Sequence, residues 1–208
     1  LNDNKIDSVG WIAISSLIQK TKTLRKLDLA DNLIGKEYCK ILSEALETNS
    51  SLRELNLNNN SLFDKECKNI SNFLLKNNTL NVLKMKNNHI MTKGCQAIAS
   101  KLINNNSLQE IDLDTNFFSP NKGIKIFIQT LFENTSLIKI SFIPKGCKYK
   151  NQKTIKNRKE MDFLLHCNLG WSMENHRGFC MTFGEAILTF YLVLKRMQKE
   201  LHLMVPKL

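Results

Sequence analysis

The sequence lacks the short motifs that mark most enzymes. It has no G-x-S-x-G nucleophile elbow, no phosphate-binding loop, no paired acids at a catalytic spacing and no H-E-x-x-H zinc motif. It also has no C-x-x-C pair, so a zinc site would have to be assembled from scattered side chains, namely Cys147, His166, Cys167, His176 and Cys180. The favoured alternative for these five residues is buried thiols and surface histidines. We therefore expect no catalysis, no cofactor, no metal and no small-molecule substrate.

An apolar run long enough to cross a membrane is also missing. The stretch Phe179–Leu194 has sixteen residues and includes Gly184 and Glu185, whereas a span needs about 20 predominantly apolar residues. The sequence begins without Met and shows no secretory leader, which suggests a fragment of a longer protein. We expect no membrane span and a cytoplasmic location, with the nucleus as the alternative.

The positive charge is concentrated near the C-terminus. Residues 145–208 carry 12 Lys and Arg against 5 Asp and Glu, while residues 1–144 carry 18 against 14. The run Lys145–Lys159 has seven Lys and Arg in fifteen residues and no acid. Binding of nucleic acid is therefore expected only through this run, and a solvated linker is the favoured alternative.

One motif recurs with an almost constant period of 28 residues. It reads L-x-x-L-x-L-x-x-N-x-L or a close variant, and its copies begin at Leu24, Leu52, Leu80 and Leu108, with an incomplete copy at Leu137. Leu1, Asn4 and Ile6 fit the end of an earlier copy. Four consecutive matches at one period indicate an array in which each unit contacts only its neighbours.

Each repeat predicts a short strand, a turn, a helix and a return. Its two apolar residues around a polar one alternate as in a strand, as in Leu27/Leu29, Leu55/Leu57, Leu83/Met85, Ile111/Leu113 and Ile140/Phe142. The Asn that follows offers a donor and an acceptor to backbone groups at the turn, which predicts a structural ladder of Asn4, Asn32, Asn60, Asn88 and Asn116. Apolar residues at offsets of three and four then predict helices along Trp11/Ile14/Ile18, Cys39/Leu42/Leu46, Cys67/Ile70/Leu74 and Cys95/Ile98/Leu102. Polar runs over residues 48–50, 76–79, 104–107 and 134–136 predict the returns.

The regular spacing of Cys39, Cys67 and Cys95 places three thiols at one position of successive repeats. Such a column differs from the disulfide framework of a small secreted domain. We expect packed thiols in a reducing compartment.

These residues resemble the leucine-rich repeats of the ribonuclease-inhibitor class. The pattern L-x-x-L-x-L-x-x-N-x-I with an N-T or N-S return is most similar to the arrays of NOD-like receptors and of small intracellular leucine-rich-repeat proteins. It departs from the pattern where Tyr38, Glu66 and Lys122 replace the glycine that Gly10 and Gly94 provide. The resemblance implies an α/β fold, a right-handed solenoid or horseshoe with parallel strands on the concave face and helices on the convex face.

Two regions are expected. Residues 1–143 hold four full repeats with a partial one at each end, and residues 144–208 form a basic linker and a helical tail. The segment Phe183–Met204 is apolar enough for a helix that covers the exposed edge of the last repeat.

The expected function is non-catalytic protein binding through the concave strand face, because alternation along each strand points one row of side chains outward. The candidate partner-binding residues are Lys26, Asp28, Glu54, Asn56, Asn58, Lys84, Lys86, Glu110, Asp112 and Asp114, with Ala30 and Val82 among them. Lys84 and Lys86 are expected beside Asp112 and Asp114 on the next strand, about 4.8 Å away. The alternative is a set of exposed ion pairs contributing about 0–1 kcal/mol each.

Fold analogy supplies another alternative. Ran GTPase-activating proteins are built on the same repeat type, although no catalytic Arg or Asn position can be matched in this sequence. One contrast tests the array itself: Asn88→Ala should cost about 1–3 kcal/mol, whereas Asn58→Ala on the strand face should be nearly neutral.

Overall fold

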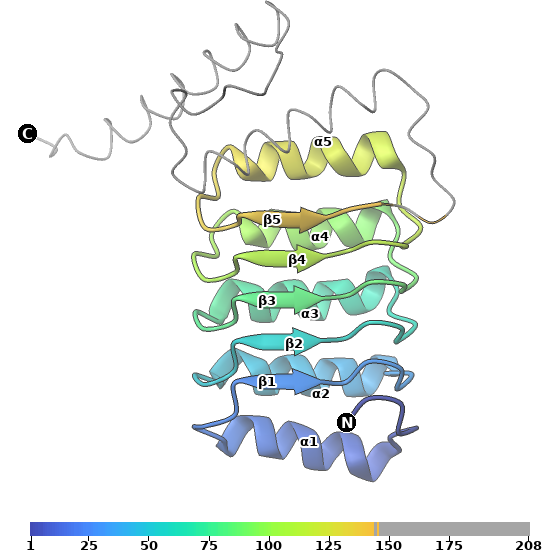
Figure 1. Ribbon diagram of the computed structural model, residues 1–208, viewed down its shortest axis with the longest axis vertical. Helices are drawn as coiled ribbons and strands as arrows, with labels where there is room; N and C mark the ends of the chain where they lie inside the picture. The colour runs from blue at the N-terminus through green and yellow to red at the C-terminus, as the bar shows by residue number, and fades with distance from the viewer. Residues whose placement is uncertain (144, 146–208) are drawn as a thin grey trace, which may run out of the picture.

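The computed structural model describes residues 1–143 and Lys145. Helices and strands alternate along this part of the chain, and Figure 1 shows one layer of strands lying over one layer of helices. The helices are α1 (Ser8–Lys20), α2 (Lys36–Thr48), α3 (Asp64–Lys76), α4 (Thr92–Leu102) and α5 (Pro120–Leu131). The strands are β1 (Lys26–Asp28), β2 (Glu54–Asn56), β3 (Val82–Lys84), β4 (Glu110–Asp112) and β5 (Lys139–Ser141). The predicted α/β solenoid is confirmed.

All five strands pair in parallel, in the order β1-β2-β3-β4-β5. Facing residues differ by 28 in number between the first four strands, as for Leu27 and Leu55, and by 29 between β4 and β5. Backbone hydrogen bonds continue past the ends of the short strands, for example from Leu57 N–H to Lys84 O at 2.8 Å. The pairing register therefore follows the sequence period.

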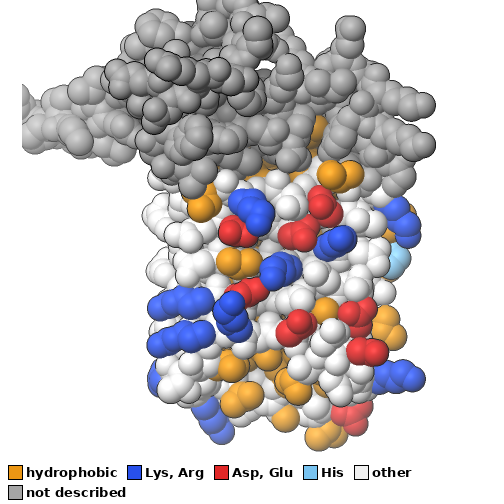
Figure 2. Space-filling view, in the orientation of Figure 1, with side chains coloured by type: hydrophobic (Ala, Val, Ile, Leu, Met, Phe, Trp, Pro, Cys, Tyr) orange, Lys and Arg blue, Asp and Glu red, His pale blue; other side chains and the backbone are white. Residues whose placement is uncertain are grey.

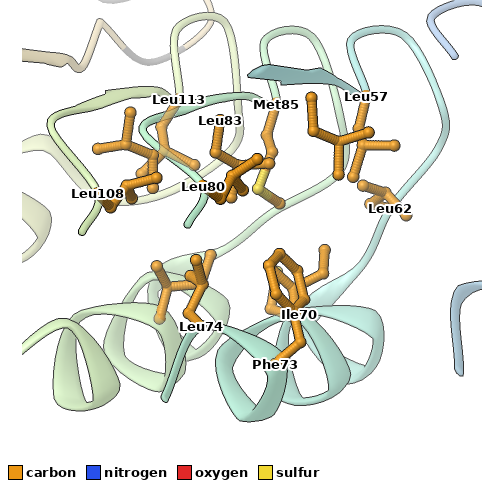
Figure 3. Packing of buried hydrophobic residues seen from close by; sticks show 14 of the residues in the cluster. Leu57, Leu62, Ile70, Phe73, Leu74, Leu80, Leu83, Met85, Leu108 and Leu113 are labelled. Atoms are coloured by element: carbon orange, nitrogen blue, oxygen red, sulfur yellow. The ribbon is translucent and has the colours of Figure 1, made fainter. Parts of the chain in front are cut away.

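The core lies between the two layers. Its strand side consists of the apolar pairs Leu27/Leu29, Leu55/Leu57, Leu83/Met85, Ile111/Leu113 and Ile140/Phe142, all buried. Figure 3 shows Ile70, Phe73 and Leu74 of α3 pointing toward these strand residues. Each fully buried side chain of this size contributes about 1.5–3 kcal/mol relative to an exposed one, so neighbouring repeats hold one another together.

The last full repeat has one extra residue between its ladder asparagine, Asn116, and the glycine in the first turn of its helix. Gly123, not Lys122, therefore occupies the glycine position, and Ile124 takes the place of the cysteine found in earlier repeats. A Cβ atom at position 123 would overlap the ring of Phe142. The expectation that Lys122 replaces this glycine is wrong, because a constant period misses the insertion.

Cys39, Cys67 and Cys95 are free thiols buried in a single column. Burial disfavours the thiolate, so it raises the pKa of Cys39 to about 12 and also raises the pKa of Cys67 and Cys95. These side chains act as small packing groups and are poor nucleophiles at neutral pH.

Within residues 1–143 and Lys145, no helix is long and apolar enough to cross a membrane. The predicted linker and tail over residues 144–208, with the proposed capping segment Phe183–Met204, lie outside the described residues except for Lys145. The division of the chain at residue 143 stays a prediction.

Candidate protein-binding surfaces

One column of asparagines joins the repeats where each strand leaves the sheet. The buried members are Asn32, Asn60, Asn88 and Asn116. The Oδ1 of Asn88 accepts the backbone N–H groups of Asn60 and Leu62, both at 3.0 Å, and its Nδ2 donates to Leu57 O and Met85 O. Four buried backbone groups thus depend on one side chain, which fixes the spacing between adjacent repeats.

The residue before each ladder asparagine adopts a left-handed backbone. These residues are Asp3, Asp31, Asn59, Asn87 and Thr115, with φ between 52° and 60°. Asn and Asp tolerate this region, whereas a β-branched residue is strained in it. Thr115 therefore carries backbone strain that its four counterparts avoid.

A second column of buried asparagines closes the return from helix to strand. Its members are Asn49, Asn77, Asn105 and Asn134. The Nδ2 of Asn77 donates to Leu46 O at 2.7 Å, and its Oδ1 accepts the N–H groups of Thr79 at 2.9 Å and Leu80 at 2.8 Å. The polar runs that contain these asparagines predict only turns. Their spacing of 28, 28 and 29 residues was the signal that could have identified them.

The strand face carries charged and polar side chains across the sheet, and Figure 2 shows basic and acidic groups interspersed over it. Lys26, Asp28 and Lys86 are exposed, whereas Glu54, Asn56, Asn58, Lys84, Glu110, Asp112 and Asp114 are half-buried. Val82 is half-buried as well. Ala30 is only 4% exposed, so it does not contribute to this face. Its methyl group is too short to reach past the longer side chains nearby.

In the first part of the strand face, one carboxylate joins three strands. Glu54 on β2 lies 2.9 Å from Lys26 Nζ and 2.5 Å from Lys84 Nζ. Lys84, with Lys26, lowers the pKa of Glu54, and Glu54 in turn raises the pKa of Lys84. Lys84 does lie opposite Asp112 in the register, as expected, but its ammonium group pairs diagonally with Glu54 instead.

In the second part of the strand face, carboxylates prevail. Glu110 pairs with Lys139 at 3.0 Å. The Oδ1 of Asp112 accepts the N–H of Asp114 at 3.0 Å, and the Oδ1 of Asp114 accepts the N–H of Ile143 at 2.7 Å. Burial raises the pKa of Asp112, because loss of water disfavours its charged form.

Asn58 contributes more to the structure than its exposure suggests. Its Oδ1 accepts the backbone N–H of Lys86, one repeat away, at 2.7 Å. Removing that acceptor would leave the Lys86 N–H to water. Alternation alone does not reveal this bond, and the nearly neutral outcome of Asn58→Ala stays a prediction.

The part of the chain described by the structure contains no group of three or more His, Cys, Asp and Glu side chains placed to hold a metal ion. The weaker zinc alternative, formed by Cys147, His166, Cys167, His176 and Cys180, lies outside the described residues. Of the basic run Lys145–Lys159, only Lys145 is described.

Known proteins share the fold. A family model described as Leucine Rich Repeat matches residues 51–73. A structure described as Leiomodin-1 Actin-Binding Site 2 has a TM-score of 0.67 and 24% identity, and the match covers 75% of this chain and 87% of that one. The tropomodulin C-terminal domain of Caenorhabditis elegans has a TM-score of 0.65 and 16% identity, covering 77% of this chain and 93% of that one. Comparison with curated proteins gave no match.

These matches and the repeating architecture show a leucine-rich-repeat solenoid. They do not distinguish the ribonuclease-inhibitor class from other classes of the repeat. The likeness to NOD-like receptor arrays stays a prediction.

Proposed function

We propose that this chain is a non-catalytic scaffold that binds a protein partner through its strand face. The observation that carries the proposal is the row of charged and polar side chains held in register across successive strands. The two asparagine columns fix that register, so the row is already ordered before a partner arrives. Preorganisation lowers the entropy lost on binding.

The charge pattern indicates what the partner surface should look like. Lys26 and Lys84 pair with Glu54 on one part of the face, where Lys86 and Asp28 are also exposed, while Asp112 and Asp114 lie on the other. Complementary charges steer association and fix orientation. A partner that fits would present acidic groups toward Lys86 and basic groups toward β4.

A matched pair of charge reversals tests this surface. Lys86 and Lys68 are both exposed, and the ion pairs of the described residues involve neither, but Lys68 lies on α3 in the helix layer. We expect Lys86→Glu to abolish capture of the partner and Lys68→Glu to leave it unchanged, measured by quantitative affinity capture with each folded variant. Equal capture by the two variants, or loss only with Lys68→Glu, would contradict the proposal.

Actin is the first partner to test, because the leiomodin-1 structure is described as an actin-binding site and its match covers most of this chain. The measurement is co-sedimentation with filamentous actin, with a binding assay for monomeric actin alongside. Binding that is lost with Lys86→Glu and kept with Lys68→Glu would identify actin as the partner. Absence of binding in both assays would remove actin and leave the strand face to be tested with other proteins.

A further inference from the structure

An apolar edge crosses three repeats beside the strand face, where the chain passes from strand to helix. We define this aromatic edge as Phe63, His89, Met91 and Phe117. The rings of Phe63 and His89 stack with centroids 4.9 Å apart, and those of His89 and Phe117 with centroids 5.4 Å apart. Phe63, Met91 and Phe117 are 51%, 55% and 46% exposed. Such a continuous exposed apolar strip is uncommon on a protein surface without a binding role.

The backbone places these rings. The residues after the first three ladder asparagines, Lys5, Leu33 and Ser61, have φ between 46° and 54°. His89 and Phe117 follow the next two asparagines without this left-handed backbone, and their N–H groups donate to Leu62 O and Ile90 O, each at 2.8 Å. The altered turn holds both residues against the preceding repeat, so their rings lie one above the other.

The charges available beside the aromatic edge are positive. The first turns of α3, α4 and α5 expose Lys65, Lys93 and Lys122, whereas α2 carries Glu37 at the equivalent position. The ion pairs of the described residues involve other lysines. Lys145 lies over the Phe117 ring, with its Nζ 5.2 Å from the centroid.

The two carboxylates next to the aromatic edge already bind backbone groups. The Oδ1 of Asp64 accepts the N–H groups of Met91 and Gly94, both at 2.8 Å. Glu66 is only 6% exposed, and its Oε2 accepts the N–H of Phe63 at 3.0 Å. Neither acid forms an ion pair among the described residues, and four lysines, Lys65, Lys93, Lys122 and Lys145, outnumber the two acids, so the edge carries a net positive charge.

A shallow cleft of about 390 Å³ opens within this edge. Its walls are Phe63, Asp64, Lys65, Glu66, His89 and Met91. The rings and the Met91 side chain offer an apolar surface large enough for a bulky side chain, and the Lys65 ammonium group is available to a carboxylate of the same ligand. The cleft therefore combines an apolar contact with an ionic contact, as the whole aromatic edge does.

We propose that the aromatic edge binds an acidic segment of a partner protein that carries bulky apolar side chains. The lysine row supplies complementary charge, and the cleft between Phe63 and Met91 accepts an apolar side chain. A nucleic acid fits less well, because both faces of His89 are covered by neighbouring rings, and Phe117 lies between His89 and Lys145. At His89, bases would find ring edges instead of the ring faces on which they stack.

Fluorescence anisotropy with defined probes tests the proposal. The probes are a labelled peptide alternating glutamate with leucine and phenylalanine, a matched peptide alternating glutamate with serine, and a labelled oligo-dT. Phe63→Ser introduces the residue that Ser119 provides at the equivalent position of the last repeat, and Lys65→Glu introduces the residue that Glu37 provides in α2. Lys68→Glu is the control with the same charge change in the helix layer.

We expect the apolar acidic peptide to bind at least about ten-fold more tightly than the serine peptide. Phe63→Ser and Lys65→Glu should each weaken its binding about ten-fold, while Lys68→Glu and the strand-face variant Lys86→Glu leave it unchanged. Thermal unfolding of every variant verifies the fold. Because Lys86→Glu tests only the strand face, failure of one surface is separable from failure of the other.

Three results would overturn the inference. Equal affinity for the two peptides would show that charge alone is recognised, and oligo-dT binding with the same sensitivity to Phe63→Ser would assign the edge to nucleic acid. A lack of measurable binding by the apolar peptide would show that the edge does not accept this class of ligand.

Discussion

The first three repeats and the last two share one core but expose different surfaces. In the first repeats the residue after the ladder asparagine has a left-handed backbone, as at Leu33 and Ser61. The first turn of α2 exposes the acidic residue Glu37. In the last two repeats the turn changes and His89 and Phe117 stack, whereas lysine already takes the place of Glu37 at Lys65 in α3. The repeated positions therefore build the scaffold, whereas a few unrepeated ones determine which side chains its surface exposes.

The strand face differs between the same two regions. Around β2 the carboxylate of Glu54 is shared by two lysines, so charge is largely paired. Around β4, Asp112 and Asp114 bind backbone N–H groups. The strand face therefore carries paired lysines around β2 and carboxylates bound to backbone groups around β4.

The largest expected effect separates the interior of the asparagine ladder from its end. Asn88→Ala removes hydrogen-bond partners from four buried backbone groups and should lower the free energy of unfolding by about 3 kcal/mol. Asn4→Ala should change it by less than about 0.5 kcal/mol, because Asn4 is exposed. Chemical denaturation of both variants measures the contrast. Equal losses would mean that the ladder does not join the repeats as described.

The glycines give the next contrast between the two regions. A Cβ atom at Gly94 would lie 2.5 Å from Asp64 Oδ1 and 2.8 Å from Ile90 Cγ2, so Gly94→Ala should cost about 2 kcal/mol. At Gly35, the N-cap of α2, the nearest atom is Tyr38 Cδ2 at 3.6 Å and φ is −73°, which Ala adopts easily, so Gly35→Ala should change the free energy of unfolding by less than about 1 kcal/mol. Thermal unfolding distinguishes the two. A similar small effect at both positions would show that Asp64 moves aside freely.

A gain in stability is expected at Thr115. Its φ is 60°, and the equivalent residues Asp31, Asn59 and Asn87, with φ of 58°, 56° and 52°, tolerate this region better. Thr115→Asn should raise the free energy of unfolding by about 1 kcal/mol, measured by chemical denaturation. The control Asn87→Thr should lower it by a similar amount. A loss on Thr115→Asn would mean that the threonine makes a compensating contact.

The smallest effects concern the two kinds of carboxylate on the strand face. The pKa of Glu54 lies below its ordinary value of 4.5, so Glu54 stabilises the fold above that pH and loses this contribution as the pH falls through its folded pKa. Glu54→Gln should therefore cost about 0.5 kcal/mol at neutral pH and nothing at low pH. Urea denaturation across pH measures this. A cost that persists at low pH would show that charge is not its origin.

Asp112 should behave in the opposite way. Its pKa lies above its ordinary value of 3.8, so its charged form destabilises the fold as the pH rises through the folded pKa. Asp112→Asn, which introduces the residue found at Asn56, should stabilise the protein at neutral pH by up to about 0.5 kcal/mol. In the same pH series, a gain that does not fade toward low pH would contradict this assignment.

The period in the sequence was enough to place the strands, the helices and the buried apolar positions, because identical spacing puts equivalent residues into one register. It was not enough for features that a single repeat changes. The extra residue before Gly123 displaces the buried positions of α5 by one residue. The altered backbone at His89 and Phe117 creates a ring stack that alternation cannot reveal.

Polar positions were harder to predict because the sequence does not show whether an amide is buried. Asn77 lies in a run of polar residues typical of a solvated turn, yet it is 2% exposed and holds a helix end to the next strand. The partner of Lys84 was missed for a related reason. Register identifies the residue directly opposite, whereas a long ammonium side chain reaches the diagonal Glu54.

Site-specific photo-crosslinking tests binding at the strand face most directly. A photoreactive amino acid would replace Lys86 on the strand face in one variant and Lys68 on the helix layer in the other, and adducts would be measured by mass spectrometry in the presence of the partner. The account predicts adducts from position 86 and none from position 68. Adducts formed only from position 68 would contradict it.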